Sequence, residues 1–217
     1  MTNMFDYLTW RVDLTFSQVL PNPVDALIFS TLAYVFYGDK AKAEPGQAVT
    51  LGECAAEFFT LENLENRVRV KKDMDLLRAA AATTRFGQTR LCMYENRFLP
   101  EQETQFAAMT FLLDDGTMFV VYRGTDNSLV GWKEDFNMTF QQSIPAQRLA
   151  QEYIRRAAQS AEAPIRVAGH SKGGNLAVFA AARCSPQVRA RILEVYNNDG
   201  PGFTKYMMGD PGYLEVV

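Results

Sequence analysis

The stretch Ile165–Ala181, IRVAGHSKGGNLAVFAA, constrains the fold of this 217-residue chain more than any other. It opens with β-branched and small apolar residues, passes through glycines around Ser171, and continues into an alanine-rich run. A strand that turns sharply into a helix and leaves a serine hydroxyl exposed needs residues without side chains beside the serine. Gly169 and Gly173 occupy those positions. The pattern therefore predicts a nucleophile elbow with Ser171 as the nucleophile.

Two alternatives compete with this interpretation. Glycine and serine are common enough for the pattern to arise by chance in a glycine-rich turn with a capping serine. A phosphate-binding loop is disfavoured, because the spacing G-x-x-x-x-G-K-[ST] is absent and Lys172 precedes the glycine pair. The strand pattern before Ser171 and the helix pattern after it favour the elbow.

The first 85 residues are predicted to be mainly helical. Asn22 and Pro23 give a cap and a first helical residue for a helix that Gly38 ends. Thr50, with a glutamate three residues later, forms a capping box for a second helix through Phe59. A third helix is expected over residues 72–82.

From residue 86 onward, strand and helix patterns alternate. Asp114-Asp115-Gly116 predicts a hairpin turn between the first strands. The alternation predicts the α/β class, with a largely parallel sheet that is entered through this antiparallel hairpin and has helices on both faces. Strands are expected at 89–98, 105–113, 117–122, 165–169 and 191–197, and helices at 145–160 and 172–183. We expect one domain over residues 1–217, with a helical lead-in (1–85) and a sheet core (86–217).

Composition excludes several classes of protein. The net charge is −3 at pH 7, and no lysine or arginine block could follow a nucleic-acid backbone. No apolar run reaches the ~20 residues of a membrane span, and the acidic N-terminus does not resemble an export signal, so a cytoplasmic protein is expected. Cys54, Cys92 and Cys184 are odd in number and far apart, which favours buried thiols. No metal and no cofactor are expected.

A nucleophilic serine needs donors for the oxyanion that forms on attack. The backbone N–H of Lys172, the first residue of the expected helix, is one candidate. Thr125 is the other, because it follows the strand that ends at Tyr122 and offers both a backbone N–H and a hydroxyl.

Residues 119–138, FVVYRGTDNSLVGWKEDFNM, and residues 167–177, VAGHSKGGNLA, resemble the class-3 lipase branch of the α/β-hydrolases. In that branch an R-G-[ST] oxyanion loop, a W-x-x-D segment and a G-H-S-x-G-G elbow occur in this order. Within it, DYLTWRVDLTFSQ, PVDALIFSTLAYV and NNDGPGF are similar to an uncharacterised bacterial family of lipase-like hydrolases. The resemblance implies an α/β-hydrolase fold and hydrolysis of a small-molecule or lipid ester. We interpret Arg123, Trp132 and Asp135 as a packed, hydrogen-bonded support for the oxyanion loop.

The base that would activate Ser171 is the open question of this sequence. Its only histidine is His170, which directly precedes the serine on a strand where successive side chains point to opposite faces. We therefore expect His170 to support the elbow. In α/β-hydrolases the histidine follows serine and acid along the chain. The resemblance implies relatives that continue past Val217, so the hydrolase domain is expected to be C-terminally incomplete here.

Asp199 is the candidate acid, because it ends a strand expected beside the serine strand. Its alternative role is to form the turn in Asn-Asp-Gly-Pro-Gly, since aspartate and glycine favour turns. The function expected is a serine ester hydrolase that forms an acyl-enzyme on Ser171. The alternative is a catalytically incomplete protein of hydrolase fold that binds a lipid or a protein partner.

Overall fold

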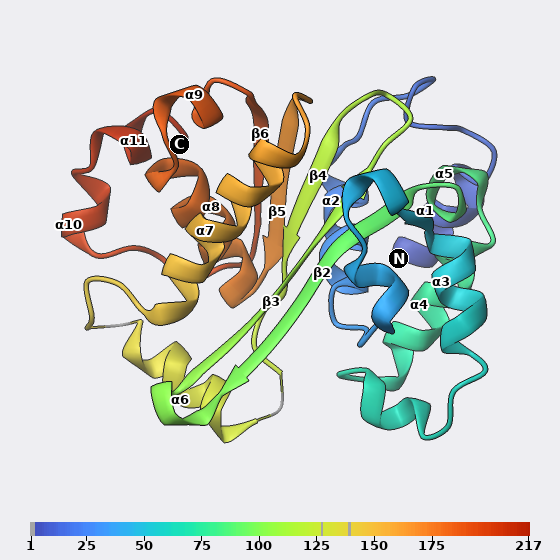
Figure 1. Cartoon of the computed structure of the whole chain (residues 1–217), viewed down its shortest axis with the longest axis horizontal. Helices are drawn as coiled ribbons and strands as arrows, with labels where there is room; N and C mark the ends of the chain where they lie inside the picture. The colour runs from blue at the N-terminus through green and yellow to red at the C-terminus, as the bar shows by residue number, and fades with distance from the viewer. Residues whose placement is uncertain (1–2, 127, 139) are drawn as a thin grey trace.

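The computed structural model describes residues 3–126, 128–138 and 140–217. Within these residues six strands form one sheet, in the order β1-β2-β3-β4-β5-β6 (Figure 1). The strands are β1 (Val49–Thr50), β2 (Arg90–Leu99), β3 (Thr104–Leu112), β4 (Met118–Tyr122), β5 (Ile165–His170) and β6 (Ile192–Asn198). The predicted α/β class is confirmed.

The sheet is mixed, so the expectation of a mostly parallel sheet is wrong. β1, β2, β3 and β4 pair antiparallel in turn, whereas β4–β5 and β5–β6 are parallel. The reason lies in the connections. The short helix η4 (Pro100–Gln102) joins β2 to β3, and the predicted turn around Gly116, with φ of 83°, joins β3 to β4. Such connections are too short for the crossover that parallel strands need.

The residues before β2 form mainly helices, together with the short strand β1. These helices are α1 (Met4–Trp10), α2 (Pro23–Leu32), α3 (Leu51–Phe58), α4 (Lys71–Ala81), α5 (Thr84–Gly87), η1 (Asp39–Lys42), η2 (Pro45–Gln47) and η3 (Leu64–Arg67). The helix expected to reach Gly38 ends at Leu32. After it, the backbone N–H groups of Tyr34 and Val35 donate to the carbonyl oxygens three residues earlier, which tightens the last turn.

The remaining helices follow β4. They are α6 (Leu129–Asn137), α7 (Pro145–Ser160), α8 (Lys172–Arg183), α9 (Pro186–Arg189), α10 (Lys205–Met208) and α11 (Pro211–Leu214). None of the helices in the described part of the chain combines the length and apolar character that a bilayer crossing requires.

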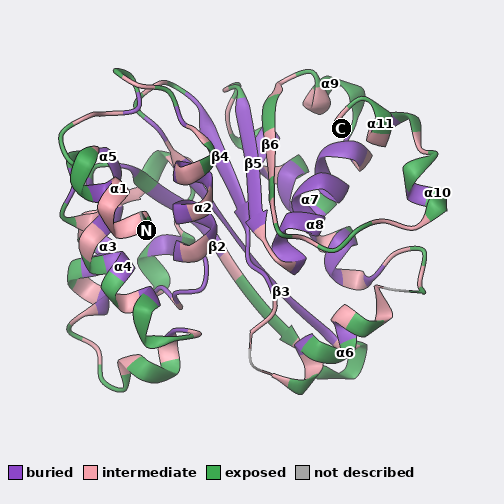
Figure 2. Ribbon diagram, turned by 180° about the vertical axis from the view of Figure 1, so that it is seen from behind, coloured by how far each residue is buried: buried purple, intermediate pink, exposed green. Residues whose placement is uncertain are grey.

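Helices cover both faces of the sheet, as the alternation predicted, and each face has its own core (Figure 2). On one face, Phe29 of α2 packs against Phe111 and Phe119 of the sheet. On the other, Tyr122 and Tyr153 pack edge to face between sheet and α7. The three cysteines are free and buried, as expected.

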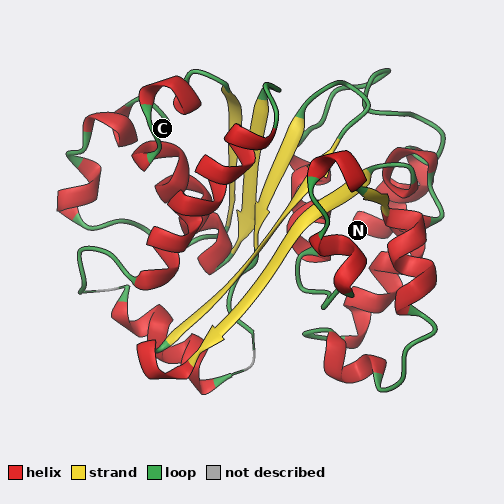
Figure 3. Cartoon of the chain, viewed as in Figure 1, coloured by secondary structure: helices red, strands yellow, loops and turns green. Residues whose placement is uncertain are grey.

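The carboxyl ends of β4, β5 and β6 lie side by side at one end of the sheet, where α8 begins (Figure 3). Arg123 follows β4, Ser171 follows β5 and Asp199 follows β6. In open α/β sheets this edge is where ligands bind. The predicted site residues therefore come to one edge from three separate strands.

Candidate active site at the serine elbow

Ser171 occupies the turn between β5 and α8, as the glycine pattern predicted. Its backbone has φ of 57° and ψ of −131°, a conformation that a residue with a side chain rarely adopts. Holding a residue in such a conformation costs about 1–3 kcal/mol, and residues of this kind cluster at functional sites. The described backbone thus stores strain at the predicted nucleophile.

The glycines around Ser171 are required by packing. A Cβ on Gly169 would overlap the backbone of Gly173, and one on Gly173 would overlap the backbone of Tyr122 and Arg123. A Cβ on Gly174 would overlap the side chain of Asn197. Strand β5, helix α8 and the end of β4 therefore approach so closely that only glycine fits.

The loop after β4 passes directly against the elbow. A Cβ on Gly124 would lie 2.5 Å from the carbonyl oxygen of His170 and 3.2 Å from the Cβ of Ser171. The next residue, Thr125, donates its hydroxyl to Oδ1 of Asp135 at 2.6 Å. Burial raises the pKa of the Asp135 carboxyl, which the Thr125 hydroxyl opposes. The structure thus brings together the serine, the Thr125 loop and the predicted support Asp135.

The Lys172 side chain makes contacts that the sequence did not reveal. Its ammonium donates to Oε2 of Glu134 at 2.6 Å and to the carbonyl oxygen of Gln105 at 2.8 Å. Both charged side chains are 1% exposed. Sequence reasoning used only the backbone of Lys172. A lysine in a buried turn could have indicated a carboxylate partner, because a buried ammonium requires a compensating negative charge.

His170 contacts the N-terminal helical region, and its predicted role as a support of the elbow stays a prediction. Its Nδ1 lies 3.1 Å from the hydroxyl oxygen of Tyr34, just beyond α2. Burial and the charge of Arg69 lower the pKa of His170, while the charge of Asp199 raises it. The ring therefore joins the elbow to the N-terminal helices.

The expected support formed by Arg123 and Trp132 is only partly correct. Arg123 is 2% exposed, donates to Asn96 Oδ1 at 3.2 Å and stacks on Phe36. Trp132 does not pack beneath the loop, because its side chain is 67% exposed. Helix α6 directs its carboxylates inward, which leaves Trp132 on the outer side.

An apolar stripe therefore faces outward on α6. Leu129, Trp132, Phe136 and Phe140 are between 60% and 82% exposed. Leu129, Trp132 and Phe136 follow helical spacing on α6, and Phe140 lies beyond the end of the helix, where its ring contacts that of Phe136. A contiguous exposed apolar patch on a folded protein marks an interaction or substrate surface.

Asp199 follows β6 in a left-handed conformation with φ of 57°, and its side chain is exposed. The preceding residue, Asn198, accepts a hydrogen bond from the backbone N–H of Ser171 at 2.9 Å. The turn itself is closed by Gly200, whose N–H donates to Asn197 Oδ1 at 2.9 Å. Asp199 thus lies at the predicted edge, in a turn that also fits its alternative role.

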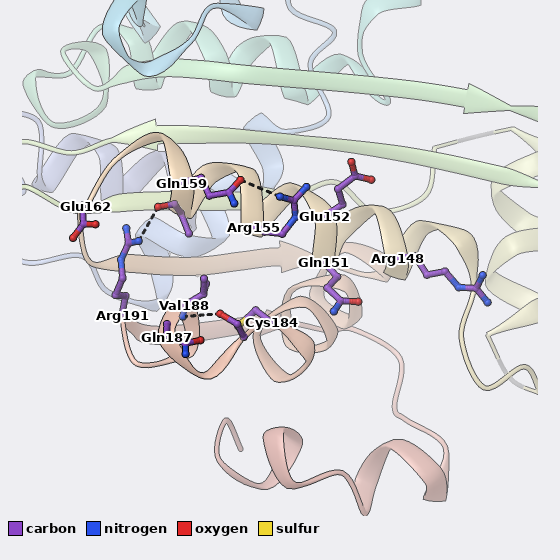
Figure 4. Close-up of a pocket in the computed structure, with 12 residues that line it drawn as sticks. Arg148, Gln151, Glu152, Arg155, Gln159, Glu162, Cys184, Gln187, Val188 and Arg191 are labelled. Carbon is purple, nitrogen blue, oxygen red and sulfur yellow. Dashed lines mark hydrogen bonds between the residues drawn. The ribbon is translucent and has the colours of Figure 1, made fainter.

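A hollow lies away from Ser171, between α7 and α9 (Figure 4). It encloses about 900 Å³ and is lined by mainly polar side chains, among them Arg155, which pairs with Gln159. None of the predicted site residues lines it. We place the site at Ser171, because strain, close packing and buried polar contacts coincide there. Among the described residues, no group of three or more histidines, cysteines or carboxylates could hold a metal ion.

Comparison with known proteins gives one family. The sequence model of the Mbeg1-like family matches residues 80–217, which is more than half of the chain and includes the elbow and the Thr125 loop. No curated protein is similar enough to this chain to serve as a relative.

Proposed function

We propose, from the premise that the chain belongs to the Mbeg1-like family, that it is a serine hydrolase acting on carboxylic esters. The observation that carries this proposal is the strained Ser171 at a strand-to-helix turn, with the Gly124–Thr125 loop packed against it. The resemblance to class-3 lipases supports an α/β-hydrolase architecture and the same residue roles.

In this proposal Ser171 Oγ attacks the ester carbonyl carbon and forms an acyl-enzyme, while the alcohol leaves with a proton. The backbone N–H groups of Lys172 and Thr125 receive the oxyanion. Water then attacks the acyl-enzyme, releases the acid and restores Ser171. Asp199 is assigned as the acid that would orient a base histidine.

His170 is not the base in this proposal, because it ends β5 directly before Ser171, and neighbouring side chains of a strand point to opposite faces. Because the sequence has no second histidine, free imidazole in solution is the simplest substitute for the base. We expect slow hydrolysis of a p-nitrophenyl ester that rises with imidazole concentration. Imidazole hydrolyses such esters by itself, so the rise is measured against imidazole without protein. The part of the rise that exceeds this background should be lost in Ser171→Ala.

The substrate class proposed is an ester with an apolar acyl chain. The exposed stripe on α6 supports it, because α6 also holds Thr125 through Asp135. Comparing p-nitrophenyl acetate with a p-nitrophenyl ester of a longer chain tests it. Trp132→Ser should slow the longer ester more than the acetate.

A fluorophosphonate probe tests the nucleophile directly. Ser171 Oγ would bond to phosphorus, fluoride would leave, and the hydroxyl proton would go to the buffer. Mass spectrometry should find the adduct on the peptide with Ser171, and none in Ser171→Ala. Ser143→Ala is the matched control and should label normally. Labelling of Ser171→Ala at the wild-type rate would refute the proposal.

The second candidate is a non-catalytic protein that binds a lipid or a protein partner. It is favoured by the sequence, which has no histidine besides His170 that could serve as the base. This candidate predicts no adduct at Ser171, together with binding to lipid vesicles that Trp132→Ser weakens.

A further inference from the structure

Two adjacent carboxylates on α6 reach both residues assigned as oxyanion donors. Asp135 accepts the hydroxyl of Thr125, and Glu134 accepts the ammonium of Lys172. One short helix therefore contacts the two sides of the proposed oxyanion site. The contact with Thr125 lies within the support predicted from sequence, whereas the contact with Lys172 does not.

The Glu134 carboxylate is also held by backbone donors from two further elements, β3 and α7. Its Oε2 also accepts the backbone N–H of Gln105 at the start of β3, at 3.1 Å. Its Oε1 accepts the backbone N–H of Ala146 in the first turn of α7, at 3.3 Å. Glu134 is 1% exposed, so this position is set by the fold.

Lys172 depends on that carboxylate. It is the first residue of α8, where the helix dipole disfavours a positive charge, and its ammonium is buried. Glu134 supplies the compensating charge at 2.6 Å. The same residue carries the backbone N–H that follows Ser171, so a shift of its side chain is transmitted to the elbow.

We propose that Glu134 is a positioning residue for the reaction at Ser171, acting through Lys172, and that α6 holds both oxyanion donors in place. The proposal rests on the function proposed above. It assigns Glu134 no contact with the substrate. Its effect is to fix the backbone N–H of residue 172 where the oxyanion forms.

The test measures the rate constant of fluorophosphonate labelling beside thermal stability. Because single removal of a buried charge threatens folding, the main variant is the neutral pair Lys172→Met with Glu134→Gln. We expect it to fold and to label about 10²-fold more slowly, since small misplacement of reacting groups has effects of this order. With an ester substrate, kcat should fall while KM stays near the wild-type value.

Glu134→Asp is the second variant, because it keeps the charge but moves the carboxylate by one methylene. It should fold and label more slowly than wild type, and Lys172→Arg, which retains a donor, should label faster than the neutral pair. The matched control is Arg85→Met with Asp25→Asn, which neutralises another buried ion pair and should not change the labelling rate.

Each result separates the two proposals. If wild-type Ser171 takes no label even with imidazole present as the external base, both the proposed function and the positioning role are overturned. If wild type is labelled and the folded neutral pair is labelled equally fast, only the positioning role is overturned. Equal slowing in the Arg85 and Asp25 control would also overturn it, because the effect would then follow general stability.

Discussion

Two buried ion pairs of similar chemistry lie in different regions of this molecule. In the N-terminal helical region, Arg85 and Asp25 pair at 2.7 Å with fully buried side chains. At the elbow, Lys172 and Glu134 pair at 2.6 Å with side chains 1% exposed. The difference between them lies in what surrounds each pair.

Arg85 donates to carbonyl oxygens of the loop before α2, among them those of Leu14 and Val19. Asp25 also accepts the backbone N–H of Asn22 at the start of α2. This pair therefore fastens a loop to helices. The Lys172 pair instead fastens the elbow to α6, so the same interaction is expected to affect stability in one region and chemistry in the other.

The largest expected effect is on stability in the first region. Asp25→Asn leaves the Arg85 guanidinium buried without a compensating charge, which typically costs about 3–5 kcal/mol. Urea unfolding should measure this loss. At a temperature where the variant is folded, Ser171 should label at the wild-type rate. A slower rate in folded protein would show that the regions are not separate.

A glycine in each region gives a second comparison. A Cβ on Gly87 would overlap the backbone of Ala81, and a Cβ on Gly124 would overlap Tyr34 and His170. Gly87→Ala should destabilise by about 1–3 kcal/mol, as overpacking does, without changing the labelling rate. Gly124→Ala should slow labelling about 10²-fold, because it displaces the oxyanion loop. Equal labelling rates in the two variants would contradict this division.

The sequence predicted those features of the fold that depend on local pattern. The two faces, the hairpin at Asp114–Gly116 and the strand-to-helix turn at Ser171 all follow from neighbouring residues. The sheet was wrongly predicted to be mostly parallel, because alternation of elements was weighed above connection length. The antiparallel hairpin of β3 and β4 and the parallel pairing of β4, β5 and β6 were predicted correctly. The connection at residues 100–103 is too short for a crossover, so the antiparallel pairing of β2 and β3 was open to prediction.

The candidate site likewise has a part that the sequence predicted and a part that it did not. Gly169, Ser171 and Gly173 are close in sequence, and their spacing is set by the turn itself. The bonds from Lys172 to Glu134 and Gln105 join residues 38 and 67 positions apart. Partners at such separations follow from the packing of α6 and β3 on the elbow, which a single sequence does not specify. The exposure of Trp132 was missed for the same reason.

A smaller effect is expected from two threonines, Thr125 in the loop after β4 and Thr110 on β3. Thr125→Val removes the hydroxyl bound to Asp135 and leaves the carboxylate without that donor, so labelling should slow about tenfold, the equivalent of about 1.4 kcal/mol. Thr110→Val is the matched control, since the Thr110 hydroxyl lies 2.9 Å from that of Tyr153, away from the elbow. It should lower stability and leave labelling unchanged. Slowing in both variants would show a general effect of packing.

The smallest effect concerns His170, where the two regions meet at Tyr34. Burial and Arg69 lower the pKa of this ring below its usual value near 6.5. Between the folded and the unfolded pKa of His170, the unfolded chain therefore binds more protons than the folded chain. The contribution of His170 to the free energy of unfolding is thus present above pH 6.5 and is lost as pH falls through the folded pKa. Unfolding measured from pH 7 downward should show the loss, and His170→Gln should lack it.

Because His170 is the only histidine of the sequence, its NMR titration is unambiguous. Arg69→Met should raise its pKa, since Arg69 lowers it, and Asp199→Asn should lower it further, since Asp199 raises it. Shifts in those directions would place the charge of Asp199 close to the elbow, where an acid of the proposed site has to lie. An unchanged pKa in Asp199→Asn would remove Asp199 from the site and leave its left-handed backbone as a turn former only.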